Sequence, residues 1–421
     1  MHLLRLGCLG GVLNVVSCGS DRAADAPADG SVPTDNETDG VAGDRSTQSC
    51  DAGAACTDAN APDSALPMAV TRVAGHLHQT CALTTAGGLK CWGRGYPGDG
   101  TNMKPLTPAD STGFTSGLAA VACGLVHTCV LTSSGKVACW GNNASGQIGD
   151  GTSQNDRLTP VEVPGLTSVV AIAAGAAHTC ALMSTGRVTC WGDNNAGQIG
   201  AGTAAEQHSP MEVSGLAESA VAIAAGQQHT CAAISKGGVK CWGSNGSGQI
   251  GDGTSGASRP MPTDVLSLAG TRIKALSGTL GYSCALTSAG AVKCWGSAYL
   301  GDGTRQQSLT PVDVVGLTSG VTAIAGSGDH TCALLSNGGI KCWGSNTYGD
   351  VGDGTNAMER RAPVDVSGLT AGVMAIGVGT FHTCALTFSG AVKCWGFNAD
   401  GQVEPADAGQ NRPLPVDVTG F

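Results

Sequence analysis

The stretch from Gly175 to Asn194 reads GAAHTCALMSTGRVTCWGDN, and it decides the fold because close copies of it recur along the chain. Its two cysteines have nine residues between them, and a tryptophan follows the second. Seven cysteine pairs share this spacing: Cys81 and Cys91, Cys129 and Cys139, Cys180 and Cys190, Cys231 and Cys241, Cys284 and Cys294, Cys332 and Cys342, and Cys384 and Cys394. Self-similarity with a period of about 50 residues indicates a propeller or a solenoid.

The residues between the two cysteines of a pair have the pattern of a β-hairpin. In the first repeat Leu83 lies opposite Leu89 if the turn contains Gly87. Cys81 then faces Cys91, and opposed residues of antiparallel strands have Cβ atoms roughly 4.5 to 5.5 Å apart. This separation allows a cross-strand disulfide, so we expect all seven pairs to be bonded. Disulfides at fixed spacing are typical of an oxidising compartment.

Each repeat also holds enough short strands for a propeller blade. A small apolar strand such as 170–174 precedes the hairpin, and a segment such as 160–163 follows it after a Gly-rich turn. The 66 glycines and the low aromatic content of 4% suit short strands and tight turns. We therefore predict an all-β, seven-bladed β-propeller of four-stranded blades over residues 67–421, with segments from both chain ends pairing to close the ring.

The repeats resemble a known family. The pattern Gly-x-x-His-Thr, Ala-Leu, Trp-Gly-x-Asn, Gly-Gln-Ile-Gly and Pro-Val, fullest around Trp140, Trp191 and Trp242, is similar to the regulator of chromosome condensation repeat. The resemblance implies a seven-bladed propeller. The founding member looks like a nuclear protein that binds chromatin and exchanges nucleotide on a small GTPase, but the acidic leader and paired cysteines of this chain depart from it. Exported bacterial relatives include an inhibitor of β-lactamases, which implies protein binding by one propeller face.

The first residues have the features of an export signal. Residues 1–17 carry Arg5 and then a mostly apolar run, too short to span a bilayer as a stable helix. The run ends at Val15-Val16-Ser17-Cys18, which resembles a bacterial lipobox. We predict that Cys18 is lipidated, the alternative being a plain secretory signal. The expected location is the bacterial envelope, as a lipoprotein of the outer membrane or cell surface, or else the periplasm or the medium.

Residues 18–66 are predicted to form a disordered acidic linker, because they contain almost no large apolar side chain. Nine Asp and one Glu against two Arg give residues 19–66 a charge of about −8, out of −10 for the chain. The remainder shows no stripe of Lys or Arg, so we expect no nucleic-acid partner. Within the linker, Cys50 and Cys56 are candidates for an eighth disulfide. We expect a monomer that touches a membrane only through its lipid.

Three chemical alternatives remain open. His178 lies two residues before Cys180, which permits zinc binding, although a buried histidine that hydrogen-bonds a neighbouring turn fits the pattern better. Gly-Asp-Gly-Thr, as at 149–152, permits calcium binding, but each loop offers one carboxylate and Asp-Gly is an ordinary turn signal. We predict no cofactor and no enzyme, since the sequence shows no catalytic motif. Cys123 is expected to be a buried, unpaired thiol.

The segments after each Trp-Gly differ most between repeats and should gather on one face. They carry tyrosine and arginine, which are common binding hot spots. The candidate binding residues are Tyr96, Tyr299, Tyr348, Arg157, Arg259, Arg305, Arg360 and Arg361. We expect this face to bind a protein or a glycan. The alternatives are a structural component of an envelope or spore coat, and an enzyme whose site is assembled from several loops.

Overall fold

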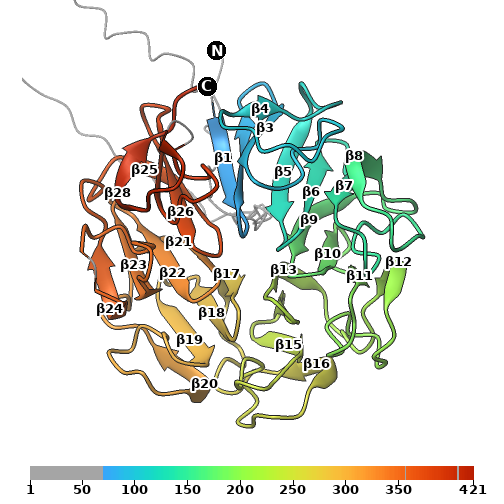
Figure 1. The fold of residues 1–421 in the computed structure, drawn as a ribbon. Helices are drawn as coiled ribbons and strands as arrows, with labels where there is room; N and C mark the ends of the chain where they lie inside the picture. The colour runs from blue at the N-terminus through green and yellow to red at the C-terminus, as the bar shows by residue number, and fades with distance from the viewer. Residues whose placement is uncertain (1–69, 356, 405–406) are drawn as a thin grey trace, which may run out of the picture. The chain divides into compact units, whose positions relative to one another are not determined.

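The computed structural model describes residues 70–355, 357–404 and 407–421. They form seven four-stranded antiparallel sheets, or blades, around a central channel (Figure 1). The predicted seven-bladed propeller is confirmed. The predicted signal, the linker, Cys18, Cys50 and Cys56 lie outside the described residues. In the described part of the chain no helix has the length and hydropathy of a membrane span.

Every blade consists of four consecutive strands, and the first strand of each lines the channel. Blades 1 to 4 contain β1 (Val70–Gly75), β2 (Gln79–Thr84), β3 (Leu89–Gly93), β4 (Ala109–Asp110), β5 (Leu118–Cys123), β6 (His127–Thr132), β7 (Val137–Gly141), β8 (Arg157–Glu162), β9 (Val169–Ala174), β10 (His178–Met183), β11 (Val188–Gly192), β12 (Gln207–Glu212), β13 (Ala220–Ala225), β14 (His229–Ile234), β15 (Val239–Gly243) and β16 (Arg259–Asp264). Blades 5 to 7 contain β17 (Ile273–Gly278), β18 (Tyr282–Thr287), β19 (Val292–Gly296), β20 (Ser308–Asp313), β21 (Val321–Ser327), β22 (His330–Leu335), β23 (Ile340–Ser345), β24 (Glu359–Asp365), β25 (Val373–Val378), β26 (His382–Thr387), β27 (Val392–Gly396) and β28 (Arg412–Asp417).

The second and third strands of each blade form the predicted hairpin. In blade 1, Cys81 pairs with Cys91 and Leu83 with Leu89. The seven predicted cysteine pairs are disulfide-bonded in the structure, with Cα atoms 4.0 to 4.1 Å apart. The tryptophan after each pair is fully buried, and Trp191 of blade 3 packs on Ile148 of blade 2. The hydrophobic core therefore lies between blades, in seven layers around the ring.

A repeated hydrogen-bond latch joins one blade to the next. At the junction of blades 2 and 3, His127 Nε2 lies 2.8 Å from Thr179 Oγ1. The Thr179 hydroxyl donates to the Gln147 carbonyl at 3.0 Å, so it accepts the hydrogen bond from the imidazole. Trp191 Nε1 donates to the same carbonyl at 2.9 Å. Two residues of blade 2 thus hold two residues of blade 3.

The latch explains why histidine recurs in the repeats. Burial lowers the pKa of His127 to about 3, which keeps the imidazole neutral. Gly124 is required beside it, because a Cβ there would lie 2.3 Å from His127 Cε1. The same contact joins His178 to Thr230, His229 to Ser283, His330 to Thr383 and His382 to Thr80. The histidines are buried hydrogen-bonding residues as predicted, but they bind a strand of the next blade, and the disulfides leave no paired thiolate for zinc.

Among the described residues the ring closes without any exchange of strands, so our expectation that the two chain ends pair was wrong. Strands β25–β28 form one sheet and β1–β4 another, and β1 packs against β25 and β26 (Figure 1). The latch recurs here: His382 Nε2 lies 2.8 Å from Thr80 Oγ1, and Thr80 and Trp92 donate to the Gln402 carbonyl at 2.8 and 2.9 Å. Each blade already has its full set of paired strands, so side-chain contacts close the seam.

Candidate functional site

Two kinds of loop meet at one end of the channel. The turn between the first and second strands lies at the same end as the loop after the third strand, because neighbouring strands are antiparallel. We call this end of the propeller the loop face. The opposite end, the hairpin face, carries the turn between the second and third strands and the connection to the next blade. The loops after Trp-Gly, which we predicted to gather on one face, therefore share that face with the turns between the first and second strands.

The channel opens on the loop face in a mouth with a cavity of about 280 Å³. The turns between the first and second strands of the blades line it. Backbone hydrogen bonds link these turns from blade 2 to blade 6: Leu125 N to Gly175 O, Ala176 N to Gln227 O, Gln227 N to Thr279 O, and Leu280 N to Gly328 O, at 3.0 to 3.2 Å. The part of the mouth wall that these blades contribute is consequently preformed.

The mouth turns vary between blades although the residues around them are nearly constant. The position before the latch histidine, or before its replacement, is occupied in blades 1 to 7 by His78, Val126, Ala177, Gln228, Gly281, Asp329 and Phe381. The following Thr-Cys and the preceding Gly recur in most repeats because the latch and the disulfide need them. These turns were not among the predicted binding segments. The sequence does mark these turns, because the two positions between Gly and His in Gly-x-x-His-Thr vary while the residues around them are nearly uniform.

Asp329 gives the mouth its charge. It is half-buried, and burial raises the pKa of its carboxyl group. Among the described residues that line the mouth it is the one acid, and no Lys or Arg lines it. The rest of the lining is largely apolar, including Leu77, Leu125 and Leu280.

An aromatic cluster borders the mouth across blades 6 and 7. The ring of Tyr348 lies 5.3 Å from that of Phe381 and 4.9 Å from that of Phe397, both edge to face. Phe381 also lines the mouth. All three rings are half-buried, so each presents part of its surface on the loop face. Tyr348 is the one predicted binding residue that belongs to this cluster.

A charged group continues the cluster onto blade 1. The His78 ring lies 5.9 Å from that of Phe397, and His78 Nδ1 is 3.0 Å from an Asp400 carboxylate oxygen. The other Asp400 oxygen lies 3.0 Å from Lys104 Nζ. Aromatic and charged side chains therefore extend across the seam between the first and last blades.

Asp350 lies beneath this surface. Its side chain is 1% exposed, and its Oδ1 has no hydrogen-bond partner among the described residues. Burial raises the pKa of this carboxyl group to about 8, against which the backbone amides of Tyr348 and Asp350 act only weakly. Asp350 is therefore mostly protonated at neutral pH.

The predicted arginines fall into two groups. Arg157 belongs to a closed loop: its Nε lies 2.8 Å from Asp150 Oδ2, while Asp150 Oδ1 accepts hydrogen bonds from the Thr152 amide and hydroxyl. Arg259 with Asp252 and Arg360 with Asp353 repeat this arrangement. Both Asp oxygens of these three Gly-Asp-Gly-Thr loops are thus used within the loop. In the described part of the chain no three His, Cys, Asp or Glu side chains form a metal-binding group.

The remaining predicted residues lie away from the mouth. Arg305 and Arg361 pair with Glu359 at 3.4 and 2.7 Å, and the Arg305 guanidinium lies 5.8 Å from the centre of the Tyr299 ring. Tyr96 donates to Asp156 Oδ2 at 2.6 Å. The structure therefore places these residues in contacts within one blade or, for Tyr96 and Arg305, with the next blade, and none of them lines the mouth.

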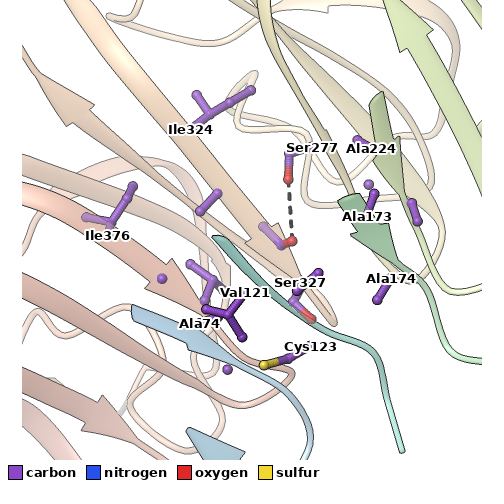
Figure 2. A pocket seen from close by; sticks show the side chains of 18 of the residues that line it. Ala74, Val121, Cys123, Ala173, Ala174, Ala224, Ser277, Ile324, Ser327 and Ile376 are labelled. Carbon is purple, nitrogen blue, oxygen red and sulfur yellow. Dashed lines mark hydrogen bonds between the residues drawn. The ribbon is translucent and has the colours of Figure 1, made fainter. Parts of the chain in front are cut away.

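The channel below the mouth has a mostly apolar lining (Figure 2). Ala74, Val121 and Cys123 are among the side chains that surround it. The Cys123 thiol is unpaired as predicted, although it lines the channel and is only partly covered. Burial raises its pKa to about 12, which makes it a poor nucleophile at neutral pH.

Comparison with known proteins identifies relatives of the propeller. A family model described as RCC1-like domain matches residues 101–420. The chain is similar to the ultraviolet-B receptor UVR8 of Arabidopsis thaliana, with 30% identity over 268 residues that cover 61% of this chain and 60% of the receptor. It is also similar to the probable E3 ubiquitin-protein ligase HERC3 of Homo sapiens, with 31% identity over 159 residues, 37% of this chain and 15% of the ligase. The matches thus span less than two thirds of these relatives.

Two solved structures share the fold. One is human WBSCR16, with a TM-score of 0.67 and 24% identity, covering 76% of this chain and 85% of the other. The second is yeast RCC1 with Kap60 bound, with a TM-score of 0.70 and 21% identity, covering 84% of this chain and 85% of the other. At this level of identity the likeness establishes the propeller architecture.

Proposed function

Because the chain belongs to the RCC1-like domain family, we propose that its propeller is a binding scaffold whose loop face takes up a protein partner at the mouth of the channel. Yeast RCC1 has been solved with a protein, Kap60, bound to it. A relative of this kind supports protein binding as a class of activity for the present chain, and identifies no partner.

The observation that carries this proposal is the aromatic cluster of Tyr348, Phe381 and Phe397 beside the mouth. Partly exposed aromatic rings on a rigid support are frequent anchors of protein interfaces, because they bury a large area at a small cost in side-chain entropy. The latch between blades 6 and 7, in which His330 bonds Thr383, provides the rigid support. The variable turn residues then supply a surface specific to this chain.

We also propose that the protein is exported to a bacterial envelope and held there by lipid on Cys18. The seven disulfides support this placement, because such bonds persist in oxidising compartments. The lipobox-like sequence ending at Cys18 supports the anchor. Intact mass of protein from its native host, with peptide mapping of the N-terminus, tests both. Lipid on Cys18 is the expected result, and an unprocessed Met1 contradicts it.

Binding is tested with two matched variants in a capture experiment from envelope extracts of the native host. Phe381→Ala removes a cluster ring, whereas Phe388→Ala removes a phenylalanine that is 65% exposed on the hairpin face. We expect a saturable partner that the wild-type protein and Phe388→Ala retain and that Phe381→Ala loses by at least roughly tenfold in affinity.

Other outcomes would contradict the proposal. A partner retained equally by both variants would remove the mouth from the interface. Self-assembly with no saturable partner would favour a structural envelope or coat component. Turnover of a small molecule, or saturable binding of DNA or RNA, would replace protein binding with a different function.

A further inference from the structure

Among the described residues, one charged residue lines the channel cavity. The cavity has a volume of about 130 Å³, comparable with the roughly 150 Å³ apolar cavity that holds benzene in other proteins. The first strands of all seven blades line it with Ala, Val, Ile, Leu, Gly, Ser and Cys residues, many of which Figure 2 shows. Arg72 of β1 completes the lining, and no Asp or Glu is among the described lining residues.

Arg72 breaks the repeat at its position. It pairs with Leu83 of β2, and the residues with the same register in the other six blades are alanines. These are Ala120, Ala171, Ala222, Ala275, Ala323 and Ala375. The propeller therefore needs only a small apolar side chain here. Arginine at this place in blade 1 is not required by the fold.

The charge of Arg72 lacks a counter-ion in the described part of the protein. No salt bridge or side-chain hydrogen bond joins its guanidinium to another described residue. Burial lowers its pKa, with no opposing carboxylate to raise it. A carboxylic acid in such a position can become neutral by binding a proton, but a guanidinium stays charged at any ordinary pH. A partly buried, uncompensated cation is costly, and a bound anion removes that cost.

We propose that the channel is a binding site for a small organic carboxylate, whose anionic group pairs with Arg72 and whose short apolar chain occupies the cavity. A guanidinium binds a carboxylate through two parallel hydrogen bonds, which favours this anion over a spherical one. The apolar lining favours a hydrocarbon chain over an inorganic ion such as phosphate. Arg72 lines the channel and is not among the residues that line the mouth, although the channel opens into the mouth. The carboxylate site can therefore be tested without the proposed protein partner.

The test uses valerate as the probe and calorimetry on the disulfide-bonded propeller. Arg72→Ala installs the residue found in the other six blades, so the variant is expected to fold. Arg187→Ala is the matched control, since Arg187 lies in the turn before β11 and pairs with Glu212 of β12, away from the channel. We expect valerate to bind the wild-type protein and Arg187→Ala alike, and to bind Arg72→Ala roughly tenfold to a hundredfold more weakly. Valeramide, the neutral analogue, should bind all three weakly and equally.

Thermal unfolding provides a second measurement. Valerate should raise the melting temperature of the wild-type protein above that in an equal concentration of chloride, and should leave Arg72→Ala unchanged. Three results would overturn the proposal: equal valerate affinity in wild type and Arg72→Ala, no valerate binding to the wild-type protein, or binding of inorganic phosphate without binding of valerate.

Discussion

Replacing Asp350 should stabilise the propeller, and the gain should depend on pH. In four other blades the same position is glutamine: Gln147, Gln198, Gln249 and Gln402. The glutamine Oε1 accepts a hydrogen bond of 2.8 to 3.0 Å from the amide two residues earlier. Asp350 is one methylene shorter, so its Oδ2 reaches the Tyr348 amide only at 3.5 Å, and Oδ1 is left unpaired among the described residues. In Asp350→Gln, the new Oε1 should accept a hydrogen bond from the Tyr348 amide. The new Nε2 should donate to the Ser345 hydroxyl, as Gln249 Nε2 donates to Ser244 Oγ.

The size of the effect follows from the pKa of Asp350, which burial raises from 3.8 to about 8. The unfolded chain ionises near pH 4, whereas the folded protein keeps the proton until about pH 8. The contribution of this group to stability is therefore complete below about pH 4, declines as the pH rises toward 8, and is constant above it. Each pH unit between these two pKa values corresponds to about 1.4 kcal/mol of unfolding free energy, so the stability lost by pH 7 approaches about 4 kcal/mol as an upper limit.

Urea unfolding of the oxidised protein at pH 4, 5.5, 7 and 8.5 measures this linkage. Asp350→Gln and Asp350→Asn should differ from the wild-type protein increasingly between pH 4 and pH 8, and Asp350→Gln should be the more stable of the two. Asp365→Asn is the control, because Asp365 is exposed and pairs with Lys341 in the same blade. A difference between Asp350→Asn and wild type that stays constant with pH would refute the conclusion that this carboxyl group is buried and protonated.

The remaining predictions concern the latch, the disulfides and the closed loops. Thr80→Val should cost roughly 1 to 3 kcal/mol by leaving His382 Nε2 unpaired, and limited proteolysis should show faster cleavage at the seam; unchanged proteolysis would contradict the role of the latch there. Replacing Cys180 and Cys190 together by serine should cost about 2 to 3 kcal/mol in urea unfolding, whereas no loss would mean that the hairpin forms equally well unlinked. Arg259→Ala should cost less than about 1 kcal/mol but should speed amide exchange in its own loop, and unchanged exchange would argue against the ion pair as the support of that loop.

The blade could be predicted from the sequence because its evidence is local. Cys180 and Cys190 are ten residues apart, and a hairpin of that length places them face to face, which the structure confirms. The latch escaped prediction because His127 and Thr179 are 52 residues apart and meet only when two blades stack. The closure of the ring depends on the same long-range contact and was predicted wrongly for that reason.

The binding surface was predicted in part. The loops after Trp-Gly do lie on one face, but Arg157 and its equivalents turn inward to an Asp seven residues earlier, a pairing that a spacing argument would have shown. The aromatic cluster joins Tyr348, from the loop after β23 of blade 6, with two residues of blade 7. Phe381 comes from the turn between β25 and β26, and Phe397 from the loop after β27. No sequence pattern brings these three residues together, because their proximity results from the stacking of blades 6 and 7.

The pairing of strands only within blades has a consequence for how such a chain can be rearranged. A reordered gene that begins at β9 and joins β28 to β1 through a linker would keep every described strand pair and every disulfide, since only the connection between β8 and β9 is cut. Duplication or deletion of a segment of about 50 residues would likewise add or remove one complete wedge. The propeller is therefore modular at the level of the gene, and an inserted blade needs a latch and a buried tryptophan that match those of its neighbours.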